Sequence, residues 1–143
     1  MFEQMNVTKT INVPSDKVWL AISAIGGLDR WFPIINSCKV EGVGVGAVRI
    51  LGLDDGAEIK DCIEEINHQD RRFRYLRTQH PFPVSHYEGI VTVSDAGNGQ
   101  CKISWVLELE ITVQNHARDD LLQFVNQALS DGIAGLEKDL QAQ

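Results

Sequence analysis

The charged residues best placed for chemistry are an aspartate and an arginine on two neighbouring strand-like segments. Asp61 lies between Ile59 and Ile63 in an alternating run, so its carboxyl shares the apolar face of the expected strand. A carboxylate on a buried face needs a partner, because desolvation disfavours its charged form. Arg49, on the preceding strand, is the expected partner.

Three interpretations of Asp61 follow from this placement. In the first, Asp61 and Arg49 form a buried structural ion pair. In the second, Asp61 is a catalytic candidate that acts as general acid or base on a bound carbonyl or enol. In the third, its carboxyl faces solvent.

Other ionisable residues make weaker cases for a site. The only basic cluster is expected to be a solvated face rather than a phosphate site, and it consists of Arg71, Arg72, Arg74 and Arg77. His80 and His86 flank a loop that contains Phe82, where a histidine can shuttle a proton near neutral pH. Since no carboxylate or second histidine stands at metal-ligand spacing, we interpret both as polar loop residues and expect no metal.

The elements that must position these side chains follow from alternation, periodicity and turn residues. The expected order is one strand, two short helices, six strands and one long helix. The expected strands are 5–13, 36–41, 48–53, 57–66, 72–79, 87–95 and 102–112. Helices are expected from Ser15, as the cap, to the Gly26-Gly27 pair, over 28–34, and over 117–140.

The last third of the chain indicates how these elements pack. The apolar residues of 117–140 recur with the 3.6-residue period of a helix that has one buried face. Strand 102–112 places its apolar side chains on one side, and these are Ile103, Trp105, Leu107, Leu109 and Ile111. The helix must therefore lie on the sheet, and a curved sheet around a helix can enclose a cavity.

Composition narrows the classes of partner. The 143 residues carry a formal net charge of -7, which argues against nucleic acid or an anionic membrane as partner. No signal peptide or membrane span is expected, and the expected location is the cytoplasm. Cys38, Cys62 and Cys101 form no C-x-x-C pair, so we expect three buried or half-buried thiols. The motifs G-x-S-x-G, G-x-x-x-x-G-K-[ST] and H-E-x-x-H are missing, and no cofactor is expected.

Several short motifs are spread over nearly the whole chain, and their order and spacing are similar to those of a known family. They are Pro14-x-x-x-Val18-Trp19, Gly46-Ala47-Val48-Arg49, Asp54-Asp55-Gly56, Asp61, Tyr75, Tyr87-x-Gly89, Trp105 and Gly135-Leu136. Together with the element order they resemble the START/Bet v 1-like (SRPBCC) superfamily. Within it, the chain is similar to the bacterial polyketide cyclase/dehydrase branch and, in layout, to the plant abscisic acid receptors.

The resemblance implies a fold and a class of ligand. The implied fold is one α+β helix-grip domain over residues 1–143, in which a seven-stranded antiparallel sheet wraps around the long C-terminal helix. The implied cavity opens near the loops between strands. Members hold sterols, lipids, polyketides, quinones or plant hormones there, and only some of them do chemistry, so the fold alone does not define the function.

With Trp105 facing inward, alternation gives a predicted ligand-binding set. From the sheet it contains Arg49, Leu51, Ile59, Asp61, Tyr75, Tyr87, Gly89, Trp105 and Leu107, and from the helix Phe124, Val125 and Ala128. Asn36 and the two tyrosine hydroxyls would orient the ligand. In the hormone receptors, a lysine of the pocket binds the carboxylate of the ligand, and the resemblance aligns Asn36 with that lysine. This difference argues against a ligand whose carboxylate is bound in the same manner.

The sequence is consistent with three functions. The first is the binding of a small hydrophobic or aromatic molecule such as a lipid, polyketide or quinone, because the inward face is rich in aromatic residues. The second is a polyketide cyclase or dehydratase that uses Asp61 with Arg49 and the tyrosines. The third is a regulatory interaction module with a protein partner. Binding ranks first, because Asp61 has a satisfactory structural explanation.

Overall fold

The structure is a computed structural model that describes residues 2–143. Met1, the first residue of the expected domain, lies outside the described residues. Alternating apolar and polar residues produce seven strands in one antiparallel sheet, in the order β1-β7-β6-β5-β4-β3-β2. The strands are β1 (Phe2–Ile11), β2 (Ile35–Glu41), β3 (Val48–Leu53), β4 (Glu58–Asn67), β5 (Arg72–Gln79), β6 (Val84–Gly97) and β7 (Gln100–Ile111).

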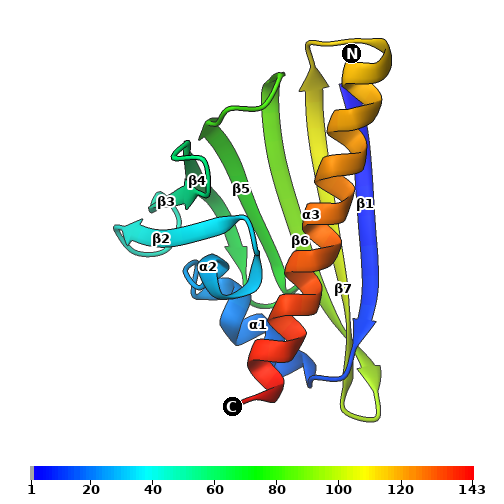
Figure 1. Ribbon diagram of the computed structural model, residues 1–143. Coiled ribbons are helices and arrows are strands. Elements are labelled where there is room, and N and C mark those ends of the chain that lie inside the picture. Colours follow the sequence, from blue (N-terminus) through cyan, green and yellow to red (C-terminus); the bar gives the residue numbers. More distant parts are fainter. Residues whose placement is uncertain (1) are drawn as a thin grey trace.

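Three helices complete the fold, and they are α1 (Ser15–Ser23), α2 (Leu28–Trp31) and α3 (Asn115–Gln141). The sheet is strongly curved, and α3 lies across its concave side while α1 and α2 follow the first strand (Figure 1). This arrangement confirms the expected helix-grip fold.

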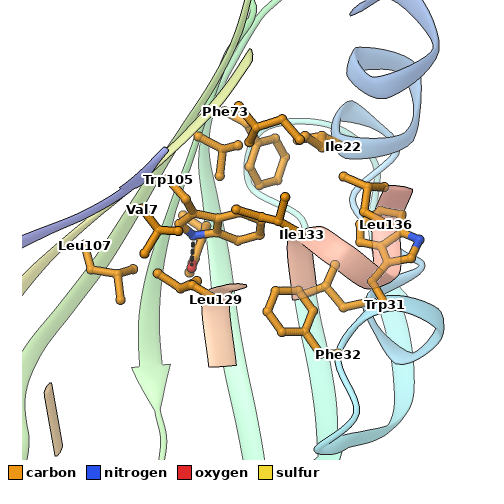
Figure 2. Packing of buried hydrophobic residues seen from close by; sticks show 14 of the residues in the cluster. Val7, Ile22, Trp31, Phe32, Phe73, Trp105, Leu107, Leu129, Ile133 and Leu136 are labelled. Carbon is orange, nitrogen blue, oxygen red and sulfur yellow. Dashed lines mark hydrogen bonds between the residues drawn. The ribbon is translucent and has the colours of Figure 1, made fainter. Parts of the chain in front are cut away.

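Helix α3 packs on the sheet through one apolar face. Its buried residues follow the helical period, and they are Leu121, Val125, Leu129, Gly132, Ile133, Leu136 and Leu140. The expected inward residues of β7 are all buried, with Ile103, Leu107 and Leu109 at 0% exposure. Figure 2 shows the Trp105 indole reaching from β7 towards Ile133 and Leu129 of α3.

Two glycines of α3 let the C-terminal end of α2 approach it closely. A Cβ at Gly135 would collide with the carbonyl oxygen of Trp31 and lie 2.9 Å from its Cα. A Cβ at Gly132 would collide with the Phe32 ring. The Trp31 indole Nε1 donates a hydrogen bond of 3.0 Å to Asp139 of α3, which fixes the same junction. Side-chain size at these two positions of α3 therefore controls how closely α2 can pack.

Most expected bounds agree with the structure to within a few residues, but the role given to Ser15 was wrong. Pro14 is the N-cap of α1, and no side chain caps the helix. Ser15 is the first helical residue, and its hydroxyl accepts a 2.8 Å hydrogen bond from Arg71 instead. The helix in 28–34 is also shorter than expected, because the chain turns extended at Phe32 before Pro33.

The three thiols are free, with Cys101 buried and Cys38 and Cys62 half-buried, as expected. Within residues 2–143, no helix is both long and apolar enough to cross a membrane.

Candidate functional site

A small cavity lies between the sheet, α2 and α3, and its volume is about 40 Å³. Its wall is aromatic and aliphatic except for one guanidinium. The lining residues are Leu28, Phe32, Ile34, Ile35, Leu53, Ile59, Tyr75, Arg77, Phe82, Tyr87, Trp105, Phe124, Val125, Ala128 and Leu129. Such a wall favours an apolar or aromatic guest over a hydrated one.

Two phenylalanines from different elements meet at one side of this cavity. Phe82 belongs to the loop between β5 and β6, and Phe124 belongs to α3; their ring centroids are 6.1 Å apart. Phe124 is 45% exposed although it also lines the cavity, so its ring lies between the interior and solvent. Among the lining residues, Phe124 is the one large apolar side chain that is exposed.

The structure brings about half of the predicted ligand-binding set to the cavity wall. The members that line it are Ile59, Tyr75, Tyr87, Trp105, Phe124, Val125 and Ala128. Alternation on β4 to β7 and the helical period of α3 place them there.

The other inward members of the set are buried but do not line the cavity. Leu51 and Leu107 are 0% exposed and contribute to the core. Gly89 lies beneath the Tyr75 ring, since a Cβ at Gly89 would collide with that ring. The Tyr75 ring therefore fills the space above Gly89.

Asn36 is exposed and does not line the cavity, so the placement predicted for it was wrong. The register between β2 and β3 shifts between Ile35 and Ser37, which leaves Asn36 outside the regular pairing. A bulge of this kind reverses the facing that simple alternation predicts.

Several lining residues were missing from the predicted ligand-binding set, namely Leu28, Phe32, Ile34, Ile35, Leu53, Arg77, Phe82 and Leu129. Leu129 could have been found from sequence, because it follows Val125 by four residues on the same face of α3. The residues around α2 carry no such signal, since a four-residue helix has too few positions to show a period.

Asp61 lies in a buried charge cluster with two arginines, which are its direct partners on the adjacent strands. The pairing register aligns Arg49 of β3, Asp61 of β4 and Arg77 of β5 in one row across the sheet. Arg49 Nε donates to Asp61 Oδ2 at 3.0 Å, and Arg49 Nη1 donates to the Ile25 carbonyl oxygen at 3.0 Å. Arg77 donates from Nε to Oδ1 at 2.8 Å and from Nη2 to Oδ2 at 3.2 Å.

The expected ion pair with Arg49 is therefore present, but the solvated position predicted for Arg77 was wrong. The Arg77 side chain is 9% exposed, whereas that of Arg74 is 36% exposed and pairs with Glu88. The inward facing of Arg77 was predictable from the sequence, because it shares one face of β5 with Phe73 and Tyr75. Grouping the four arginines by sequence proximity concealed this difference in facing.

The environment of the cluster fixes its charge states. Burial alone would raise the pKa of the Asp61 carboxyl, but the charges of Arg77 and then Arg49 outweigh it and hold that pKa below its usual range. Burial raises the pKa values of the Tyr75 and Tyr87 hydroxyls. At neutral pH the cluster thus contains an ionised Asp61 between two charged arginines, beside two protonated phenols.

Ring faces surround the two guanidinium groups. The Arg77 Cζ lies 4.5 Å from the Tyr87 ring centroid and 5.3 Å from that of Tyr75. The Arg49 Cζ lies 4.9 Å from the Tyr75 centroid and 5.6 Å from that of Phe73. Aromatic faces attract cations, so the rings help to hold both arginines away from water.

Tyr75 also accepts a hydrogen bond from Trp105, with 3.1 Å between the hydroxyl oxygen and the indole Nε1. We expect Tyr75→Phe to lower the free energy of unfolding by about 1–2 kcal/mol, because it leaves a buried indole N–H without its acceptor. Urea denaturation followed by tryptophan fluorescence measures this change. Phe73→Leu is the packing control, because it alters a neighbouring buried ring without touching the hydrogen bond; an unchanged Tyr75→Phe stability would contradict the assigned role.

His80 lies beside Phe82, one of the two rings between the cavity and solvent. Its Nδ1 accepts a 3.1 Å hydrogen bond from the Phe82 backbone N–H, and the two rings stack with centroids 5.8 Å apart. Burial, and then the charge of Arg77, lower the pKa of His80. A neutral imidazole that accepts from its own loop stabilises the loop, in keeping with the interpretation as a polar loop residue. His86 instead belongs to β6 and lies 3.4 Å from Glu88, so its interpretation as a loop residue was wrong.

The comparisons with known proteins agree with this fold. No curated protein matches the chain in sequence. Among solved structures, a Bacillus thuringiensis protein is 24% identical, with a TM-score of 0.84 over 97% of this chain and 99% of that chain. The Zhui aromatase/cyclase from a Streptomyces species is 15% identical, with a TM-score of 0.85 over 99% and 94%.

Norcoclaurine synthase from Thalictrum flavum, in complex with dopamine and hydroxybenzaldehyde, is 15% identical, with a TM-score of 0.79 over 100% of this chain and 88% of that chain. At these identities the solved structures support the helix-grip fold alone. The family model described as polyketide cyclase / dehydrase and lipid transport matches residues 3–141. Because that match spans nearly the whole chain, this protein belongs to the polyketide cyclase/dehydrase and lipid transport family, within the START/Bet v 1-like superfamily.

Proposed function

We propose that this protein binds a small hydrophobic or aromatic molecule in the cavity between its sheet and α3. The observation that carries this proposal is the cavity wall, which is apolar or aromatic at every position except Arg77. Apolar walls with a few fixed polar groups are typical of sites that hold a ligand by burial and orient it by hydrogen bonds.

The size of the cavity means that the ligand must displace side chains. A volume of about 40 Å³ is far below the roughly 300–1,000 Å³ of pockets that hold drug-sized ligands. Phe124 is the side chain most able to move, because it is 45% exposed. Rotation of Phe124 away from Phe82 would join the cavity to solvent and enlarge it, so we expect ligand uptake to involve these two rings.

Catalysis through Asp61 ranks second. Both of its oxygens accept hydrogen bonds from arginines, and the residue does not line the cavity, so its carboxylate has no direct contact with a guest there. Direct proton transfer requires hydrogen-bond reach. Regulation of a protein partner through the loop that carries Phe82 remains the third proposal, and pull-down with and without Phe82 and Pro83 tests it.

Native mass spectrometry of the protein purified without detergent tests the binding proposal. We expect an apolar molecule at near-unit stoichiometry, or uptake of an added aromatic probe such as phenylnaphthylamine. Denaturation and identification of the released molecule would then define its class. A protein that neither retains nor takes up any apolar molecule would contradict the proposal.

Filling the cavity should abolish uptake. Ala128 lines the cavity from α3, so in Ala128→Phe the new ring occupies the ligand's space, and we expect phenylnaphthylamine affinity to fall by at least about tenfold. Fluorescence titration measures it. Gln127→Phe is the matched control, because it adds the same ring at an exposed position of the same helix; equal losses in both variants would place the probe outside the cavity.

A further inference from the structure

The buried charges beside the cavity do not balance. Arg49 and Arg77 contribute two positive charges, whereas Asp61 contributes one negative charge. Within residues 2–143, Asp61 is the only buried acidic residue. The cluster therefore carries about one excess positive charge in an environment of low polarity, where uncompensated charge is costly.

Hydrogen-bond acceptors are short in the same place. The two oxygens of Asp61 already accept from Arg49 Nε and from Arg77 Nε and Nη2. Arg49 Nη2 lies 2.9 Å from Asp61 Oδ2 as an ion-pair contact, yet this buried nitrogen makes no hydrogen bond. The ring faces of Tyr75 and Tyr87 compensate part of the charge but accept no conventional hydrogen bond.

The excess charge reaches the cavity through Arg77. This is the one charged residue of the wall, and it stands with Tyr75 and Tyr87, whose hydroxyls remain protonated. The nearby His80 cannot compensate this charge, because an imidazole is neutral or positively charged. The polar part of the wall thus offers a cation and two hydroxyls, and no carboxylate faces it.

We propose that the cavity selects aromatic or apolar molecules that carry an ionised oxygen, such as a phenolate or enolate, and that this oxygen faces Arg77. This inference rests on the proposed binding function and adds the charge of the ligand to it. A charge-assisted contact between Arg77 and an anionic oxygen would neutralise the excess charge of the cluster. A neutral guest would leave that charge uncompensated, and a cationic guest would be repelled.

Matched probes that differ only in their acidic oxygen test this selection in the unaltered protein. The first pair is para-nitrophenol and para-nitroanisole, and the second is anilinonaphthalene sulfonate and phenylnaphthylamine. Above the pKa of the phenol, we expect the anionic member of each pair to bind at least about tenfold more tightly than its neutral counterpart. We also expect binding to lower the pKa of para-nitrophenol by about one unit or more, read from its visible absorbance.

Variants assign the effect to the cluster. Arg77→Gln removes the excess charge, so we expect it to abolish both the preference for the anionic member of each pair and the pKa shift of the phenol. Arg74→Gln is the matched control, because the same charge is removed from the same strand at a side chain that is 36% exposed and pairs with Glu88. Arg77→Lys keeps the charge and should retain most of the preference.

The outcomes separate this inference from the function on which it rests. If the neutral probes bind as tightly as the anionic ones, cavity binding stands and the selection for an ionised oxygen is wrong. If neither member of either pair binds, cavity binding itself fails and the inference fails with it. Should Arg77→Gln not fold, the comparison of the two probe pairs in the unaltered protein still decides the matter.

Discussion

Replacing Asp61 with asparagine is expected to lower the free energy of unfolding by about 3–5 kcal/mol. The substitution keeps the shape of the side chain but removes the only negative charge between Arg49 and Arg77. Two buried guanidinium groups would then face each other without compensation, and breaking a buried ion pair by removing one partner costs about this much. Urea denaturation monitored by circular dichroism measures the change.

The pH dependence distinguishes loss of charge from loss of packing. Because the pKa of Asp61 is lowered in the folded protein, its stabilising contribution is present above the unfolded pKa of about 3.9 and is lost as pH falls through the folded value. The difference in stability between wild type and Asp61→Asn should therefore be constant near neutral pH and shrink below about pH 4. A difference that does not change with pH would contradict the electrostatic origin.

Glu65→Gln is the control for Asp61→Asn. Glu65 also contacts two arginines, with 2.9 Å to Arg72 and 3.6 Å to Arg74, but its side chain is 29% exposed. Water screens such pairs, so we expect a loss below about 1 kcal/mol. If both variants lost the same stability, burial would not be the reason for the cost at Asp61.

The second large effect is expected at Gly135 of α3. In an ordinary helical position, alanine is more stable than glycine by about 1 kcal/mol. At Gly135 the added methyl would collide with the Trp31 carbonyl oxygen, which belongs to backbone and cannot rotate away. We therefore expect Gly135→Ala to destabilise the protein by roughly 3 kcal/mol, the upper end for overpacking, because α2 must move from α3.

Thermal and urea denaturation of Gly135→Ala measure this loss, with Ala134→Gly as the control. Ala134 is the exposed neighbour in the same turn of α3, and its replacement should cost about 1 kcal/mol through helix propensity alone. A stabilising Gly135→Ala would mean that the two helices are not in contact at this point. The Trp31 to Asp139 hydrogen bond provides a local readout, because separation of α2 and α3 should change tryptophan fluorescence.

Most of the fold was accessible from sequence because its elements are long or strictly alternating. The expected bounds of β3 and β5 agree with the structure, and the buried face of β7 was predicted residue by residue. These strands have one face on the core and one towards solvent, which gives the clearest two-residue pattern. Helix α3 was equally clear because it has 27 residues and a single buried face.

The site was only partly accessible because it depends on local irregularities and on side-chain volume. The shift between Ile35 and Ser37 turned Asn36 outward, and alternation alone contains no sign of such a shift. The size of the cavity depends on how Phe32, Tyr75 and Trp105 share the interior, which is a packing problem among distant segments. The inward position of Arg77, in contrast, was predictable from the sequence, since alternation along β5 places its side chain on the buried face.

The pairing of the first strand with the last has a consequence for synthesis of the chain on the ribosome. Val7 of β1 pairs with Trp105 of β7, 98 positions later in the sequence. At about 5–20 residues per second, β1 emerges roughly 5–20 s before its only neighbour in the sheet exists. During that interval the nascent chain displays Val7 and Ile11, so this is the period in which chaperone contact with the N-terminal segment would be most useful.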